Sequence, residues 1–123
     1  MNPSAPAGPP VDLRVLPELT GCGEDMLSEF LQDFLEVADT AVADMAIALQ
    51  AEDLAGLREA AHRVKSSARY IGATALGQLS EAIEYAARDG QGARATELLS
   101  AWQAEFLRVD DFIAGVLDEA PDA

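Results

Sequence analysis

The chain has 123 residues, with 22 Asp and Glu against 8 Lys and Arg, and therefore a formal net charge of −14 at pH 7. This length predicts one domain, and the 50% of hydrophobic residues predicts a chain that folds around a core. The negative charge argues against nucleic acid or an anionic membrane surface as the main partner. The single cysteine, Cys22, excludes an internal disulfide, a cysteine-clustered zinc site and an iron–sulfur cluster.

The first ten residues differ in composition from the rest of the chain. They hold four of the six prolines and few residues that could build a core, which predicts a flexible leader over residues 1–10. We expect the folded domain over residues 11–118 and a short tail over 119–123. No apolar run is long enough to span a membrane, and no secretory signal pattern precedes the domain. These features predict a soluble protein in the cytoplasm.

Apolar residues recur at spacings of three and four from residue 11 onward, which is typical of helices packed on one side. No stretch shows the alternation of a strand. We expect a short helix over about 11–18, followed by the turn at 20–23. Four longer helices are expected: over about 24–50, over about 53–71, from about 74 to a stop at 89–90, and over about 93–117. Asp53 is a good N-cap for the second of these, Thr74 for the third, and Gly72 and Gly90 fit helix ends.

Short glycine-containing connections make consecutive helices antiparallel neighbours. The sequence therefore predicts an all-α fold: an antiparallel up-down-up-down four-helix bundle with a short extra N-terminal helix. An irregular helical domain is the alternative. Trp102 and Phe106 lie on the inward stripe of the last helix, so we interpret them as core and not as a platform for stacking bases.

The chain contains one histidine, His62, whose position is informative. It follows Ala61, an inward-facing residue, and so points about 100° away from the buried stripe. On that outward face it is aligned with Arg58, Lys65 and Arg69. The helical register therefore predicts an imidazole that faces solvent within a basic strip.

Residues 58–69 hold four basic residues and one acidic residue, a net charge of +3, against −17 for the rest of the chain. Ser66 and Ser67 add hydroxyl groups and are small enough to leave the ring accessible. A neutral imidazole is a nucleophile near pH 7, and a phosphoryl group on its nitrogen would carry negative charge that Lys65 and the hydroxyls could neutralise. The alternative is a solvated surface histidine whose basic neighbours form ordinary ion pairs.

The stretch 61–73, AHRVKSSARYIGA, followed by Leu76, Leu79 and Glu84, resembles the signature of histidine-containing phosphotransfer (HPt) domains. That signature reads approximately A-H-x-L-K-G-S-x-x-x-[LI]-G-A. The preceding segment is also similar to the family, with a Leu-Thr-Gly turn at 19–21 and then an acidic helix that contains Phe30 and Phe34. The resemblance covers about residues 11–118.

The resemblance implies a role for each matching residue. His62 would be phosphorylated on its outer ring nitrogen, Lys65 would screen the phosphoryl charge, and Ser67 matches a position close to the site. Glu84 and Arg88 match polar positions on the adjoining helix, where Glu84 would either orient the ring or repel phosphate. The supporting residues also include Ser66, which stands where the family usually has glycine. Val64 stands where the family pattern has leucine, which is a mild change. Apart from the resemblance, the positive charge of residues 58–69 predicts partner contacts from Arg58, Arg63 and Arg69, because it would complement the acidic site of a receiver domain.

The expected function is a histidine phosphotransfer protein of a two-component phosphorelay. It would accept a phosphoryl group from a receiver-domain phospho-aspartate, or from a kinase, and pass it to another receiver aspartate. It would be a carrier without its own ATP site or cofactor, with Mg²⁺ on the partner receiver. Expected partners are response-regulator receiver domains or a hybrid histidine kinase, and the protein is expected to be monomeric.

Two other functions fit the sequence less well. One is a helical adaptor, a degenerate HPt domain that docks a receiver or kinase without chemistry. The other is the dimerisation and phosphoacceptor helices of a histidine kinase, which would need a linked ATP-binding domain. A metal site is not expected, because a single histidine with scattered carboxylates offers no converging ligand set.

Overall fold

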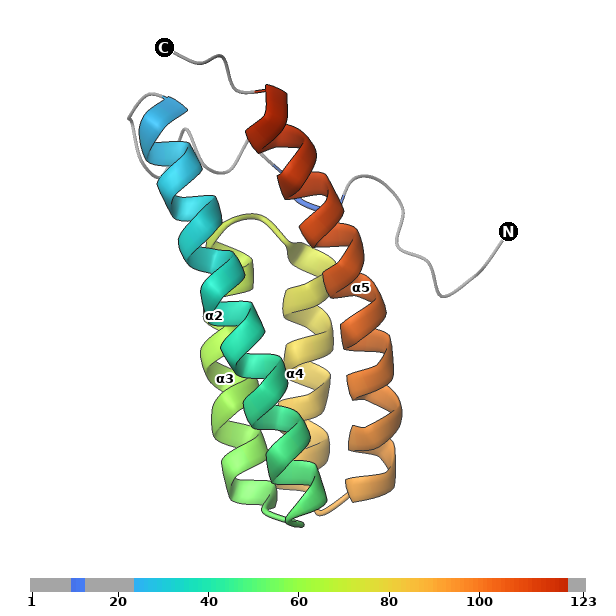
Figure 1. The fold of residues 1–123 in the computed structure, drawn as a ribbon. Coiled ribbons are helices and arrows are strands. Elements are labelled where there is room, and N and C mark those ends of the chain that lie inside the picture. Colours follow the sequence, from blue (N-terminus) through green and yellow to red (C-terminus); the bar gives the residue numbers. More distant parts are fainter. Residues whose placement is uncertain (1–9, 13–23, 120–123) are drawn as a thin grey trace, which may run out of the picture.

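The computed structural model describes residues 10–12 and 24–119, and its four helices lie side by side (Figure 1). They are α2 (Glu24–Gln50), α3 (Leu54–Tyr70), α4 (Thr74–Arg88) and α5 (Gly92–Glu119). The part of the chain so described contains no strand, and the all-α prediction is confirmed. The short helix expected over 11–18 and the turn at 20–23 fall almost entirely outside the described residues.

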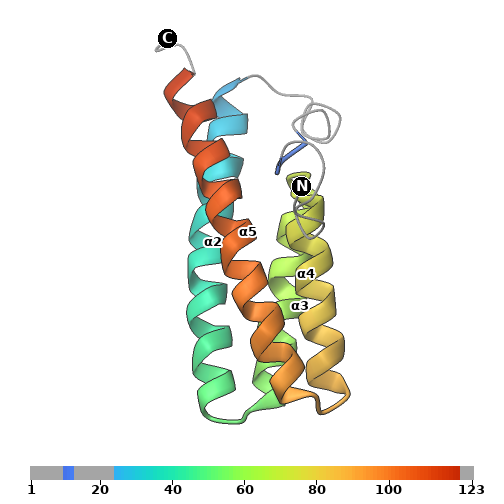
Figure 2. The ribbon, with the colours of Figure 1, turned by 90° about the vertical axis from the view of Figure 1, so that its right-hand side faces the viewer.

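The helices are joined by short turns at the two ends of the molecule. The α2–α3 and α4–α5 turns lie at one end, and the α3–α4 turn lies at the other (Figures 1 and 2). α3 packs most extensively against α4 and also contacts α2, while α5 packs against α4 and, less closely, against α2. Among these helices, none has the length and apolar character needed to cross a bilayer.

The predicted inward stripes meet in one hydrophobic core. Trp102 is fully buried, and its indole N–H donates to Ser80 Oγ at 2.9 Å, while Ser80 Oγ donates to the carbonyl of Leu76 at 2.8 Å. The rings of Trp102 and Phe106 lie 5.3 Å apart, which confirms both as core residues. Other fully buried side chains are Leu31, Met45, Leu57, Val64, Ile71, Leu76, Ile83, Val109 and Ile113.

The ends of α3 follow the predicted capping residues. The Asp53 carboxylate accepts a hydrogen bond from the Gly56 N–H at 2.9 Å, and Gly72 has a φ of +81°, the left-handed conformation that ends the helix. The start of α4 differs from the prediction, because Thr74 is already helical and Ala73 is the N-cap, with no side-chain cap. The connection between α3 and α4 is so short that Ala73 takes part in the end of one helix and the start of the next. Its N–H donates to the Ala68 carbonyl at the end of α3, and its carbonyl accepts from the Gly77 N–H in α4.

Residues 10–12 pass over the α3–α4 turn. The Val11 side chain is 1% exposed and belongs to the core, and the Asp12 N–H donates to the Gly72 carbonyl at 2.9 Å. A Cβ on Gly72 would lie 2.4 Å from the Asp12 carbonyl oxygen. Gly72 is therefore required both by its backbone conformation and by the close approach of this segment.

Two glycine-to-alanine substitutions separate these requirements. Gly90 has a φ of +72°, and a Cβ there would meet nothing within 4 Å, so Gly90→Ala should lower the free energy of unfolding by only about 1–2 kcal/mol. Gly72→Ala carries the same backbone cost and also the clash with Asp12, so it should be clearly more destabilising. Urea unfolding of both variants measures the difference. Equal losses would show that the Asp12 contact does not constrain residue 72.

Candidate functional site

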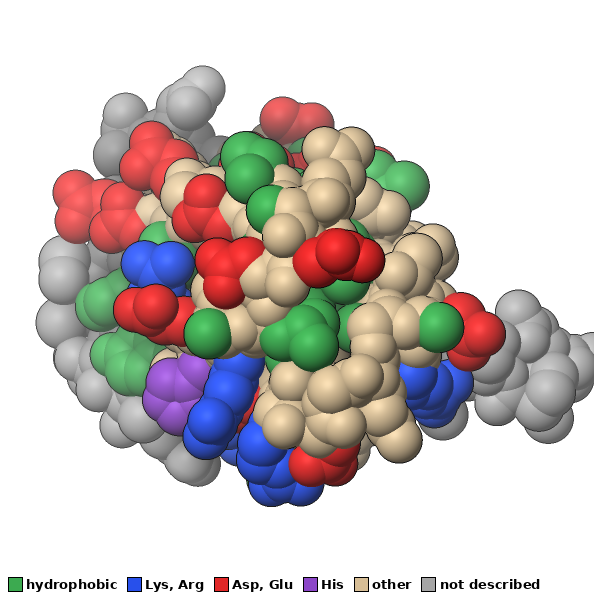
Figure 3. Space-filling model, turned by 90° about the horizontal axis from the view of Figure 1, so that it is seen from below, with side chains coloured by type: hydrophobic (Ala, Val, Ile, Leu, Met, Phe, Trp, Pro, Cys, Tyr) green, Lys and Arg blue, Asp and Glu red, His purple; other side chains and the backbone are tan. Residues whose placement is uncertain are grey.

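The imidazole of His62 lies on the outer surface of α3. Leu57, Ala61, Val64 and Ala68 face the core, and this register turns the side chain of His62 outward, where it is 60% exposed. Seen from below, the imidazole lies between hydrophobic side chains on one side and Lys and Arg side chains on the other (Figure 3). The structure thus places the ring at the surface, as the register predicts.

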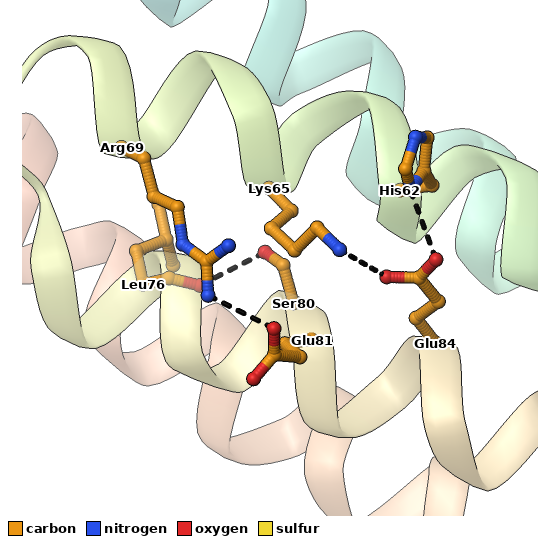
Figure 4. Close-up of polar contacts among 7 residues, drawn as sticks. All are labelled: His62, Lys65, Arg69, Leu76, Ser80, Glu81 and Glu84. Atoms are coloured by element: carbon orange, nitrogen blue, oxygen red, sulfur yellow. Dashed lines mark hydrogen bonds and ion pairs between the residues drawn. The ribbon is translucent and has the colours of Figure 1, made fainter.

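A single carboxylate on α4 holds the ring of His62 and the ammonium group of Lys65 together (Figure 4). His62 Nδ1 lies 2.9 Å from Glu84 Oε2, and Lys65 Nζ donates to Glu84 Oε1 at 2.6 Å. The side chains of Glu84 and Lys65 are only 11% and 13% exposed, whereas the imidazole extends from this pair into solvent. The sequence left two roles open for Glu84, to orient the ring or to repel phosphate, and this hydrogen bond is the contact that an orienting residue would make.

Two opposing influences act on the Glu84 carboxyl. Burial is the largest single influence and raises the pKa, but the hydrogen bonds from Lys65 and His62 and the nearby positive charge together outweigh it. The net result is a lowered pKa for Glu84. The carboxylate therefore remains ionised at neutral pH and can accept a hydrogen bond from the imidazole.

The second ring nitrogen, Nε2, lies on the side of the ring away from Glu84 (Figure 4). The ring also borders a hollow of about 600 Å³ between α2 and α3, which Ser66 and Ser67 line as well. The Ser66 side chain is exposed, and the Ser67 hydroxyl donates to the Arg63 carbonyl at 3.5 Å. Small side chains beside the ring thus leave Nε2 open to a large reactant.

Most of the basic strip is paired with carboxylates. Lys65 binds Glu84, Arg69 lies 3.0 Å from Glu81 Oε2, and Arg63 lies 3.7 Å from Asp44 Oδ2. Within the described part of the chain, Arg58 is exposed and forms no ion pair. The +3 charge that the sequence concentrates in residues 58–69 is therefore largely balanced in space by residues from α2 and α4.

Arg88 lies one helical turn beyond Glu84 but is not brought to the ring. Its guanidinium pairs with Asp89 at 3.0 Å and stacks on the Tyr85 ring, with Cζ 4.7 Å from the ring centroid. Among the described residues, no group of three or more His, Cys, Asp or Glu is arranged to hold a metal ion.

The α2 side of the site is absent from the residues that the sequence predicts. Glu36, Val37, Thr40 and Asp44 border the hollow next to His62, although they lie far from it in the chain. A weak signal was present, since Val37 lies off the inward stripe of α2 and is a 40% exposed hydrophobic residue. Which helix would border His62 depends on the packing of α2 against α3, which spacing within one helix cannot give.

Comparisons with known proteins agree with this geometry. The sequence model of the Hpt domain family matches residues 29–112, which is more than half of the chain. The chain belongs to this family. The crystal structure of histidine-containing phosphotransfer protein B (HptB) from Pseudomonas aeruginosa PAO1 is similar, with a TM-score of 0.86 and 29% sequence identity, covering 94% of this chain and 100% of HptB. No curated protein sequence matches this chain significantly.

The resemblance found in the sequence is thereby confirmed. The protein is a histidine phosphotransfer protein of a phosphorelay. Hpt proteins are phosphocarrier intermediates and not classical enzymes with an ATP site, and they interact with receiver domains and kinases.

The lowered pKa of Glu84 predicts a pH-dependent contribution to stability. Because the pKa of Glu84 is lower in the folded than in the unfolded chain, the unfolded state binds more protons than the folded state as the pH falls through this range. The contribution of Glu84 to the free energy of unfolding is fully present above the pKa that Glu84 has in the unfolded chain. It is lost as the pH falls through the pKa that Glu84 has in the folded chain. The stability difference between wild type and Glu84→Gln should therefore shrink from pH 7 to pH 3.

Urea unfolding at several pH values measures this difference. Glu59→Gln is the matched control on α3, because Glu59 is exposed and forms no ion pair within the described residues. A difference between wild type and Glu84→Gln that stays constant over this pH range would contradict the pairing.

Proposed function

We propose that His62 is the residue that carries the phosphoryl group and that Nε2 is the atom to which it is attached. The observation that supports this most is the hydrogen bond between His62 Nδ1 and Glu84 Oε2, in a ring that is 60% exposed. An ionised carboxylate only accepts hydrogen bonds, so the ring proton resides on Nδ1. The lone pair of Nε2 is then free to attack phosphorus.

The transfer is a displacement at phosphorus. The Nε2 lone pair forms the N–P bond while the P–O bond to the partner's aspartate breaks, and the aspartate leaves as a carboxylate. Nδ1 keeps its proton, so the phosphorylated ring becomes positively charged. The Glu84 carboxylate stabilises that charge at hydrogen-bond distance. The same displacement in the reverse direction passes the phosphoryl group from Nε2 to the aspartate of another receiver.

Lys65 would supply positive charge to the phosphoryl group, because it shares the Glu84 carboxylate with His62. Its Nζ is bound to Glu84 Oε1 in the unphosphorylated protein, and an ammonium group on a flexible stem has three donors to share. We propose that it contacts Glu84 and the phosphoryl oxygens together once His62 is phosphorylated. Ser66 and Ser67 are supporting residues, which keep the approach to Nε2 open and offer hydroxyl groups.

The basic residues around the site differ in their proposed parts. Arg58 is exposed and forms no ion pair within the described residues, so it is the best candidate to contact the acidic active site of a receiver. Arg63 and Arg69 would have to exchange their present partners, Asp44 and Glu81, for a partner's carboxylates. Arg88 is a peripheral candidate because it pairs with Asp89.

We further propose that the donors and acceptors are receiver domains, or a hybrid histidine kinase, and that Mg²⁺ belongs to the receiver while this chain holds no cofactor. The protein would act as a cytoplasmic monomer and take its phosphoryl group from a partner, never from ATP. Its domain would span residues 11–118, between a leader (1–10) and a tail (119–123). The alternating positions of the turns in Figure 1 support up-down-up-down order, to which the short helix over 11–18 would be added.

Incubation with a phosphorylated receiver domain should label the protein with phosphate that is labile in acid and stable in alkali, as expected for a phosphoramidate. His62→Gln should remove the label, because glutamine has no ring nitrogen that could attack phosphorus. Quantified phosphate transfer measures both results. Full labelling of His62→Gln would contradict the assignment of His62, and a wild-type protein that binds active receivers without being labelled would be an adaptor.

Lys65→Ala should slow transfer or shorten the lifetime of the phosphohistidine, by about tenfold if the lost contact contributes about 1.4 kcal/mol. Circular dichroism should show an intact fold. Arg94→Ala on α5 is the control, since it also removes one positive charge that is paired with a carboxylate, that of Glu97, at an exposed position. Kinetics that are the same for both variants would show that Lys65 has no specific part in the reaction.

A further inference from the structure

A continuous groove runs along the surface between α2 and α3. It consists of two hollows of about 600 and 370 Å³, which share Val37, Ser66 and Ser67. His62 borders the first hollow, and Phe30 and Tyr70 border the second, where their ring centroids are 5.7 Å apart. We call this surface the α2–α3 groove.

The groove is open because the residues between its walls are small, and its floor is apolar. Ala41, Ala60 and Val64 lie beneath the first hollow, and Phe34 and Ile71 lie beneath the second. Val37 and Tyr70 are 40% and 42% exposed, so hydrophobic surface reaches the solvent beside the imidazole (Figure 3). An exposed apolar strip next to a reactive residue is typical of a surface that a partner covers.

The two walls of the groove carry different charge. The α2 wall carries Asp33, Glu36 and Asp44, of which only Asp44 forms an ion pair with another described residue, Arg63 at 3.7 Å. Asp33 and Glu36 are exposed and form no ion pair within the described part of the chain. The α3 wall contributes Arg63, which pairs with Asp44, and continues beyond it with the uncharged Ser66 and Ser67. Among the described residues, the charges of Asp33 and Glu36 are therefore not balanced across the groove.

We propose that the α2–α3 groove selects the phosphorelay partner by charge. The inference rests on the proposed function. The occupant is a receiver domain that presents a ridge of apolar side chains flanked by Lys or Arg, which meet Asp33 and Glu36. A receiver with acidic residues at that flank is rejected, because like charges opposite each other raise the free energy of the complex.

The preferred partner therefore carries two kinds of surface. Its acidic active site approaches His62 and Arg58, and its basic flank lies against α2. Phosphorylation adds about 1.5–2 negative charges near one end of the groove, which strengthens the attraction for that basic flank. A receiver that is acidic over both surfaces would make only the contact with His62 and Arg58, and not the contact with α2.

The test reverses the charges of Asp33 and Glu36 on the α2 wall in the double variant Asp33→Lys/Glu36→Lys. The probe is the phosphorylated receiver that transfers fastest to the wild type among the purified receivers of the same organism. The kcat/KM for transfer is divided by the rate at which phosphoramidate, a small phosphoryl donor, labels His62 in the same variant. We expect this ratio to fall by about tenfold and the fall to be greatest at low salt.

The matched control is Asp110→Lys/Asp111→Lys on α5. These aspartates are exposed, they form no ion pair within the described residues, and α5 contributes no side chain to the groove. The net charge changes equally in both double variants, so a general effect of protein charge lowers both ratios alike and would overturn the proposal. A ratio for the groove variant that is unchanged or increased also overturns it.

A double variant that fails to fold is replaced by the milder Asp33→Asn and Glu36→Gln. Each should lower the ratio by about two- to threefold, and no effect from either overturns the proposal. Reversing the basic flank of the receiver to Glu should restore transfer to Asp33→Lys/Glu36→Lys. The proposed function fails separately, when neither phosphoramidate nor any receiver labels His62 in the wild-type protein.

Discussion

The arrangement of side chains around His62 depends on one carboxylate, that of Glu84, which binds His62 and Lys65 at once. The carboxylate is nearly buried, and the two hydrogen bonds with the adjoining positive charge more than offset the cost of that burial. Its position fixes the orientation of an otherwise exposed imidazole. An outward-facing ring without such a contact would rotate about χ1 and χ2, and Nε2, the nitrogen proposed to react, would have no defined direction.

The contact to Glu84 relies on a precise relation between α3 and α4. These two helices are joined by Ile71, Gly72 and Ala73, and they pack together more extensively than any other pair. The Asp12 N–H binds Gly72 over this turn, and Trp102 anchors α4 to α5 through Ser80. Core packing thereby holds the backbone of both helices, so the site needs only short-range contacts between side chains to be ordered before a partner arrives.

The distribution of charge gives the protein two distinct surfaces beside the histidine. Toward α4, cations of α3 pair with Glu84 and Glu81, and Arg58 remains exposed at the end of the row. Toward α2, the groove has an apolar floor and the carboxylates of Asp33 and Glu36 on its wall. An acidic protein can in this way receive the acidic active site of a receiver while its remaining charge discriminates among receivers by their flanks.

The spacing of apolar residues was sufficient to predict an all-α fold, the bounds of the helices to within a few residues, and the outward direction of His62, because these follow from the 3.6-residue period within a single helix. The motif around His62 was sufficient to indicate the family. The sequence could not decide whether Glu84 would orient the imidazole or repel phosphate. It also could not show that Arg63 and Arg69 would form ion pairs, or that α2 would form a wall of the groove. Those features depend on distances between residues 12 to 22 positions apart or on different helices, and only the packing of the helices against one another determines such distances.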